Sequence, residues 1–117
     1  MEFIRIANFI SIKTDPKKIL EELIYLDNYI DFYEDRNYRL IKIEQIDKKY
    51  IVQFEFYNEK ESCTFEVHIE ENKYREERID IIVFQEKGND VDIHNGIEPI
   101  EEAIFYPLNA NWIKEDW

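Results

Sequence analysis

The sequence predicts an α+β fold: a mostly antiparallel sheet of about five strands, with one long helix packed on one face and a short C-terminal helix, in the order β-α-β-β-β-β-α. Two observations lead to this prediction. Apolar and polar residues alternate through most of Tyr50 to Phe84, as in half-buried antiparallel strands, and an apolar stripe of helical spacing follows Pro16. A chain of 117 residues with 44% hydrophobic content suits a single globular domain, residues 1–117, with one modest core.

The N-terminal part is predicted to hold one strand and the long helix. We expect the strand from Phe3 to Lys13, with a bulge or bend near Asn8, because Asn8 interrupts an apolar parity. Asp15 can cap the helix and Pro16 suits its first position, and the helical pattern continues to about Tyr33. The stripe expected to face the sheet comprises Ile19, Leu20, Leu23, Ile24, Leu26 and Ile30.

Four further strands are predicted, and their register follows from keeping the apolar parity on one face. They are Tyr38 to Ile46, Tyr50 to Tyr57, Ser62 to Glu70 and Ile79 to Phe84. The expected partners are Phe54 with Phe65, Val52 with Val67, Ile79 with Ile69, Ile81 with Val67 and Val83 with Phe65, and on the opposite face His68 with Asp80 and Arg78 with Glu70.

The C-terminal third is predicted to be less regular. Gln85 to Ile97 contains both glycines and no regular period, which indicates a surface loop, and Glu98 to Tyr106 reads as a short helix. The tail from Leu108 to Trp117 is apolar enough that we expect it to pack over an exposed strip formed by Ile82 and Phe84.

Composition narrows the classes of partner and the compartment. A net charge of −12 disfavours direct binding to nucleic acid or to an anionic membrane, because phosphates repel carboxylates, and it favours a basic partner. The single cysteine, Cys63, cannot form an internal disulfide, so we expect a reducing, cytoplasmic setting. The N-terminus lacks the features of a signal peptide, no apolar run approaches a membrane span, and the AT-rich codon usage implied by the composition suggests a bacterial or phage origin.

Three groups of residues contain the residue types of a catalytic or metal site. For each group, a purely structural interpretation fits the sequence better. His68 beside Asp80, with Thr64 or Ser62 nearby, lacks a nucleophile elbow and is interpreted as a cross-strand polar pair. The stretch from Asp90 to Glu101 departs from a calcium loop, because Asn95 replaces the required glycine and His94 an oxygen ligand. Glu55 and Glu66 should lie diagonally across two strands, where solvent keeps both ionised. We therefore predict a non-catalytic protein with no cofactor and no metal.

Two acidic groups are the candidate partner-binding sites. The first lies at the end of the predicted helix, where acidic side chains oppose the helix dipole and alternate with aromatic residues. The second lies on the exposed sheet face. The candidate residues are Asp27, Asp31, Phe32, Glu34 and Asp35 in the first group, and Glu55, Glu66 and Glu70 in the second.

In size, acidity and element order the chain resembles the small immunity proteins of bacterial polymorphic and contact-dependent toxin systems. The nearest features are the acidic-aromatic stretch from Asp27 to Asp35 and the Asn111-Trp112 pair in the tail. The resemblance implies a protein that neutralises a cognate, nuclease-like toxin domain. An acidic surface would fill the toxin's basic cleft, and a few aromatic side chains would supply most of the affinity.

Two alternatives remain open on the sequence. One is a phage-encoded or regulatory inhibitor that mimics nucleic acid, with carboxylates spaced like phosphates along one surface. The other is a structural or homo-oligomeric subunit that buries Ile82, Phe84 and the tryptophan tail. The expected state is accordingly a monomer or a homodimer.

Overall fold

A computed structural model describes residues 2–12, 15–24, 30–31, 36–57, 62–75, 77–87 and 112–115. For residues 11–12, 30–31, 36 and 112–115 it describes the backbone alone. Its elements are β1 (Phe3–Ile12), α1 (Pro16–Ile24), β2 (Ile30–Asp31), β3 (Arg36–Ile46), β4 (Lys49–Tyr57), β5 (Ser62–Glu71), β6 (Arg78–Glu86) and β7 (Trp112–Glu115).

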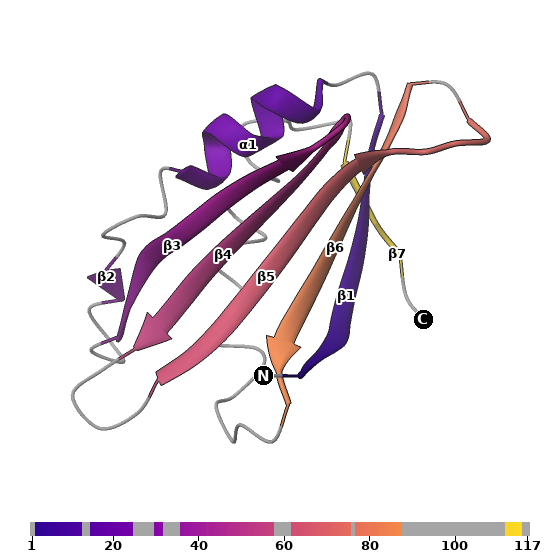
Figure 1. The fold of residues 1–117 in the computed structure, drawn as a ribbon. Helices are drawn as coiled ribbons and strands as arrows, with labels where there is room; N and C mark the ends of the chain where they lie inside the picture. Colours follow the sequence, from indigo (N-terminus) through magenta and orange to yellow (C-terminus); the bar gives the residue numbers. More distant parts are fainter. Residues whose placement is uncertain are drawn as a thin grey trace.

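The strands form one sheet in the order β2-β3-β4-β5-β6-β1-β7, and every neighbouring pair is antiparallel. Figure 1 shows the five long strands β3, β4, β5, β6 and β1 side by side, with the short β2 and β7 at opposite edges. The predicted α+β class with an antiparallel sheet is therefore confirmed. Strand β1, the first in the sequence, pairs with β6 on one side and with β7 on the other, so β1 is an inner strand.

The core lies between α1 and one face of this sheet. Ile19 and Leu23 of α1 are fully buried, and the helix contacts β4 and β5. Asp15 caps the helix as predicted, because its Oδ1 accepts a hydrogen bond from the Lys17 amide at 2.9 Å. The sheet supplies the rest of the core from alternate positions: Val52, Phe54, Phe56, Cys63, Phe65, Val67, Ile69, Ile79, Ile81 and Val83.

An aromatic cluster occupies the centre of this core. The ring of Tyr38, fully buried on β3, stacks on Phe56 with a centroid separation of 4.8 Å and meets Phe54 edge-on at 6.0 Å. Such pairs add about 0.5–1.5 kcal/mol each beyond the area they bury. The aromatic content of the sequence is thus used to fill the space between helix and sheet.

The predicted long helix is wrong at Ile30–Asp31, which form β2, paired with Arg36 and Asn37 of β3. Helix α1 is described from Pro16 to Ile24, and residues 25–29 lie outside the described residues. A helix continued to Tyr33 would have held Asp31 near the negative end of its dipole, and Asp27 and Asn28 are poor helix formers. At Ile30–Asp31 a helix is locally unfavourable, so pairing with β3 is preferred. The apolar stripe, taken alone, does not reveal this preference.

The C-terminal predictions have mixed outcomes. The helix expected over residues 98–106 lies outside the described residues, so the stated element order is not confirmed. The tail prediction is wrong for its described backbone, because Trp112–Glu115 forms β7 beside β1 rather than a cover over β6. Ile82 and Phe84 remain half-exposed on β6.

The register of the hairpin between β4 and β5 is confirmed, whereas that between β5 and β6 is wrong by two residues. Phe54 pairs with Phe65 and Val52 with Val67, as predicted. Val67, however, faces Val83 rather than Ile81. A shift of two residues keeps every side chain on its face, so alternation of apolar residues cannot detect it.

The predicted pairs of His68 with Asp80 and of Glu70 with Arg78 are wrong for the same reason. His68 faces Ile82, and Glu70 faces Asp80. The bulge expected near Asn8 is present, as a register shift between Arg5 and Ala7.

Within the described part of the chain, no helix has the length and apolar character needed to cross a membrane.

Candidate functional site

The sheet face opposite α1 carries the described members of the predicted site. Residues two apart on a strand share a face, so Glu55 of β4 and Glu66 and Glu70 of β5 project from this side. We call it the open face; its described side chains on β4, β5 and β6 are half-exposed, except Ser62, which is exposed. The prediction that these carboxylates share one face is borne out by the register of β4 and β5.

Two of these three carboxylates, Glu55 and Glu70, lie beside a basic side chain from the neighbouring strand. Arg39 of β3 approaches Glu55 to 2.5 Å, and Lys49 of β4 approaches Glu70 to 3.7 Å. Arg39 also lies over the ring of Tyr57, with its guanidinium carbon 5.0 Å from the centroid. The hydrogen bond from Arg39 to Glu55 raises the pKa of the guanidinium above its usual value, so the charge of Arg39 persists at every working pH.

Glu66 contacts a histidine of its own strand. Its Oε1 lies 2.6 Å from Nε2 of His68, and its Oε2 lies 3.5 Å from Nε2 of Gln53. The His68 ring rests against Phe84 with a centroid separation of 4.6 Å. These contacts hold the imidazole between a carboxylate and an apolar ring. Ile82 of β6 lies opposite His68, in the place where the sequence pattern predicted Asp80.

Asn72, at the end of β5, positions the next charged pair. Its side-chain oxygen accepts hydrogen bonds from the amides of Tyr74 and Arg75 at 2.9 and 3.0 Å, and its amide nitrogen donates to Asp80 at 2.9 Å. Asp80 also accepts a hydrogen bond from Nε of Arg78 at 3.0 Å. This turn shortens the loop between β5 and β6 and thereby sets the register that the sequence pattern did not predict.

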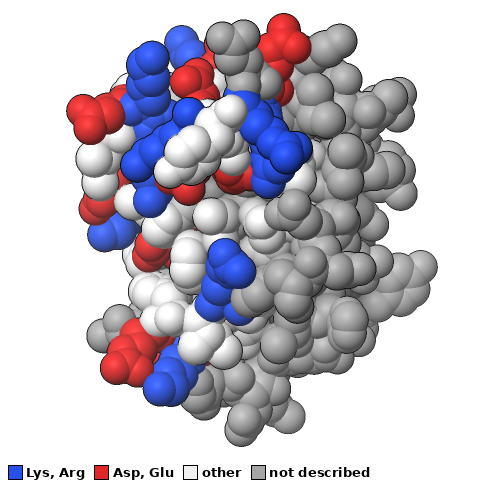
Figure 2. Space-filling model, turned by 90° about the vertical axis from the view of Figure 1, so that its right-hand side faces the viewer, with Lys and Arg blue, Asp and Glu red and all other residues white. Residues whose placement is uncertain are grey.

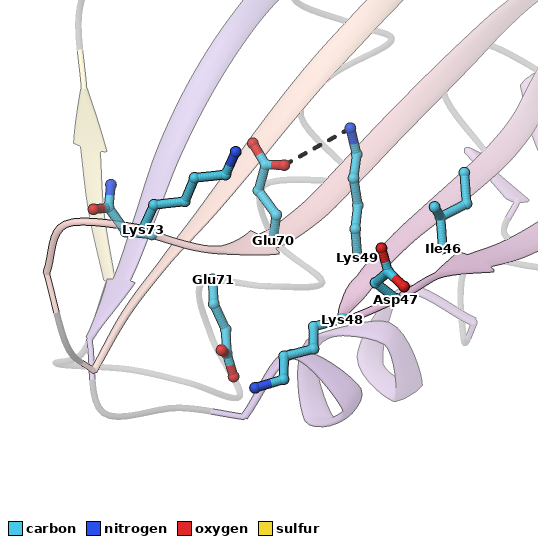
Figure 3. A pocket seen from close by; sticks show the side chains of 8 residues that line it. Ile46, Asp47, Lys48, Lys49, Glu70, Glu71 and Lys73 are labelled. Carbon is cyan, nitrogen blue, oxygen red and sulfur yellow. Dashed lines mark ion pairs between the residues drawn. The ribbon is translucent and has the colours of Figure 1, made fainter.

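A shallow groove of about 580 Å³ lies where the turn between β3 and β4 approaches the end of β5. Figure 3 shows the Lys49–Glu70 ion pair across this groove, with Lys73 reaching toward Glu70 from the other side. Its described lining is balanced in charge: Lys48, Lys49 and Lys73 against Asp47, Glu70 and Glu71, with Ile46 and Asn72 between them. Because each sign neutralises the other, the groove has no net attraction for an anion or a cation.

The first predicted acidic group is described only in part. Asp27, Phe32, Glu34 and Asp35 lie outside the described residues, and Asp31 is described by its backbone, opposite Arg36. The calcium-like stretch from Asp90 to Glu101 also lies outside them. Within the described ranges, no cluster of three or more His, Cys, Asp or Glu side chains could hold a metal ion.

Negative charge is distributed unevenly between the described and the remaining side chains. The structure describes 13 of the 27 acidic and 11 of the 15 basic side chains, a net of −2. The other 14 acidic and 4 basic side chains leave −10 of the total −12 on the rest of the chain. Figure 2 shows blue and red groups interspersed over the described part of one side of the molecule. The described side chains taken together are therefore close to neutral.

The sequence pattern did not reveal the basic partners on the open face. Arg39 and Lys49 belong to β3 and β4, and the sequence pattern predicted no residue-by-residue pairing between these two strands. It therefore could not identify the neighbours of Arg39 and Lys49 across the sheet. The contact between Glu66 and His68 could have been predicted from the sequence, because residues two apart on one strand lie side by side.

Comparison of the chain with models of protein families, with curated proteins and with solved structures finds no significant match.

Proposed function

We propose that this chain is a non-catalytic binding protein that neutralises a basic protein partner, and that its partner is the nuclease-like domain of a cognate bacterial toxin. One observation carries the proposal. Two stretches of the sequence concentrate acidic residues, whereas the described side chains, all of them elsewhere in the chain, sum to only −2. Residues 27–35 contain four acidic side chains and residues 90–102 contain five, and neither stretch has a Lys or Arg.

The chemistry of such stretches suits a basic cleft. A nuclease domain binds phosphates with Lys and Arg side chains, and carboxylates are attracted to the same positions. Tyr29, Phe32 and Tyr33 lie among the acidic residues of the first stretch, and aromatic side chains are the commonest sources of affinity at protein interfaces. Asp27, Asp31, Phe32, Glu34 and Asp35 are therefore our first choice for the binding segment.

The open face is the second choice. Glu55, Glu66 and Glu70 already contact Arg39, His68 and Lys49, and a partner would have to compete with these contacts. The alternating signs on this face also disfavour mimicry of nucleic acid by the sheet, since a phosphate backbone presents one sign alone.

The test combines capture with neutralisation. Tagged wild-type protein is used to capture partners from lysate of the source cells, and each captured protein is expressed with and without this chain. We expect a basic protein that arrests growth when expressed alone and is harmless when co-expressed. The variant Asp31→Lys with Glu34→Lys should lose both capture and rescue.

Two controls separate the candidate surfaces. Glu21→Lys with Glu22→Lys makes the same charge change on α1 and should retain capture. Glu55→Gln with Glu66→Gln and Glu70→Gln tests the open face and should also retain it. Capture and rescue that survive Asp31→Lys with Glu34→Lys but fail in the open-face variant would reverse our order of the two surfaces. If no captured protein is toxic alone, the toxin-neutralising function is wrong.

A further inference from the structure

Among the described strands, none pairs with the outer edge of β3 along half of its length. Strand β2 pairs with Arg36 and Asn37, and no described strand hydrogen-bonds to the outer side of β3 from Ile41 to Ile46. Every side chain in this segment is exposed. Alternate residues of such an edge direct their N–H and C=O groups outward, where they can pair with another strand.

This segment is also unusually apolar for an exposed edge. Ile41, Ile43 and Ile46 are 45%, 40% and 52% exposed, and they make up half of the large exposed apolar side chains among the described residues. Proteins usually protect such edges with a bulge or an outward lysine. Here β3 has a register shift at Ile41 and a lysine at position 42, but Glu44 lies beside that lysine, with Oε1 3.0 Å from its Nζ.

We propose that β3 pairs with β3 of a second copy of this chain, antiparallel and about a two-fold axis through Ile43, to form a dimer with one continuous sheet. This register places Lys42 of each copy opposite Glu44 of the other. The two isoleucines at position 43 meet on the opposite face. The two-fold axis makes the contact self-complementary and closed, so the assembly stops at two copies.

Charge selects this register over its neighbours. An antiparallel pair related by a two-fold axis can shift only in steps that keep each residue on its own face. One step one way sets Glu44 opposite Glu44, and one step the other way sets Lys42 opposite Lys42. Both neighbours place like charges directly across the strands, which is destabilising. Only the register centred on Ile43 turns both charges into attractive contacts.

The contact is short, so we expect a dimer that depends on concentration. A six-residue strand buries less than the roughly 1,200–2,000 Å² of a standard stable interface, which favours dissociation at low concentration. The overall charge of −12 per copy also opposes association, and added salt screens this repulsion. Dimerisation should therefore strengthen from low to moderate ionic strength.

Sedimentation equilibrium over a wide range of protein concentration provides the test. Wild type should dimerise. Lys42→Glu and Glu44→Lys should each weaken the dimer by at least about tenfold, because each creates two like-charge contacts across the axis. An equimolar mixture of these two variants should form a heterodimer, since every contact across the axis is then between opposite charges. The double variant Lys42→Glu with Glu44→Lys should dimerise like wild type.

Matched controls lie at the other end of the sheet. Lys87 and Glu2 form an exposed ion pair at 3.2 Å, so Lys87→Glu and Glu2→Lys repeat the same charge changes away from β3. Both should dimerise like wild type. A wild-type chain that stays monomeric at the highest concentration overturns the proposal. So do single β3 variants that dimerise normally, a mixture that stays monomeric, or assemblies larger than two. None of these outcomes bears on the proposed capture of a basic partner.

Discussion

Gln85 is the residue whose surroundings are least expected from its chemistry. It lies on the core face of β6 opposite Phe65, with 3% of its surface exposed. Its side-chain Oε1 is buried and has no hydrogen-bond partner among the described residues. A buried amide oxygen in this state costs about 1–3 kcal/mol. The sequence pattern assigned Gln85 to a surface loop, because residues 85–97 contain both glycines and no regular period, but β6 extends to Glu86.

We predict that Gln85→Met stabilises the protein. Methionine has a similar length and no unsatisfied oxygen, so the free energy of unfolding should rise by about 1 kcal/mol, measured by urea denaturation. Gln53→Met is the matched control: Gln53 lies half-exposed on the open face and donates to Glu66, so this change should be neutral or slightly destabilising. A loss of stability in Gln85→Met would mean that the Gln85 amide has a partner that holds it in place.

The β5–β6 hairpin shows how one polar residue decides the placement of a whole element. Asn72 bonds to two loop amides through its side-chain oxygen and to Asp80 through its amide nitrogen, and its backbone N–H donates to the carbonyl of Arg78 at 2.9 Å. Asparagine commonly nucleates turns in this way. The last residue of the loop, Glu77, has a φ of 63°, in the left-handed region.

We predict that Asn72→Ala lowers the free energy of unfolding by about 1–2 kcal/mol, because three side-chain hydrogen bonds are lost at once. The far-ultraviolet circular dichroism spectrum should be unchanged, since apolar pairs such as Val67 with Val83 still hold the hairpin. Lys73→Ala, one residue further along, removes an exposed side chain and should change stability by less than about 0.5 kcal/mol. Equal effects from the two variants would show that Asn72 does not organise this turn.

For the whole molecule, the important property is the net charge of −12, most of which comes from two acidic stretches, residues 27–35 and 90–102. The described side chains sum to −2 and the others to −10. Several ion pairs on the described surface, such as Arg39 with Glu55, are exposed contacts that contribute little each. Repulsion among the excess carboxylates acts in the opposite sense and grows with the square of the net charge.

We therefore predict that salt stabilises this protein at neutral pH. Raising NaCl from about 10 to 150 mM shortens the Debye length from about 30 to 8 Å, and the free energy of unfolding should rise by about 1 kcal/mol. The same titration near pH 4.6, the isoelectric point calculated from the sequence, should show little increase because the net charge vanishes there. A neutral-pH stability that falls with salt would mean that the surface ion pairs outweigh the repulsion.

The candidate site was predictable to different degrees for its two parts. The shared face of Glu55, Glu66 and Glu70 follows from period-two alternation and the β4–β5 register, and both are confirmed. Their basic neighbours were not foreseen, because Arg39 and Lys49 reach them only once strand pairing is known in detail. The group from Asp27 to Asp35 stays a prediction as a binding site. Its predicted position at a helix end is wrong for Asp31, which lies in β2.

By itself the sequence determined the α+β class, the cap at Asp15, the inward parity of the central strands and the acidic balance. These are local or additive properties, set by side-chain periodicity and by counting charges. Only the three-dimensional fold revealed the pairing of Ile30–Asp31 with β3, the β5–β6 register, the addition of β7 beside β1 and the basic partners of Glu55 and Glu70 on the open face. Each of these features depends on which distant segments pair with one another. Period-two alternation is the same for every register that keeps each side chain on its face, so it cannot distinguish between such pairings.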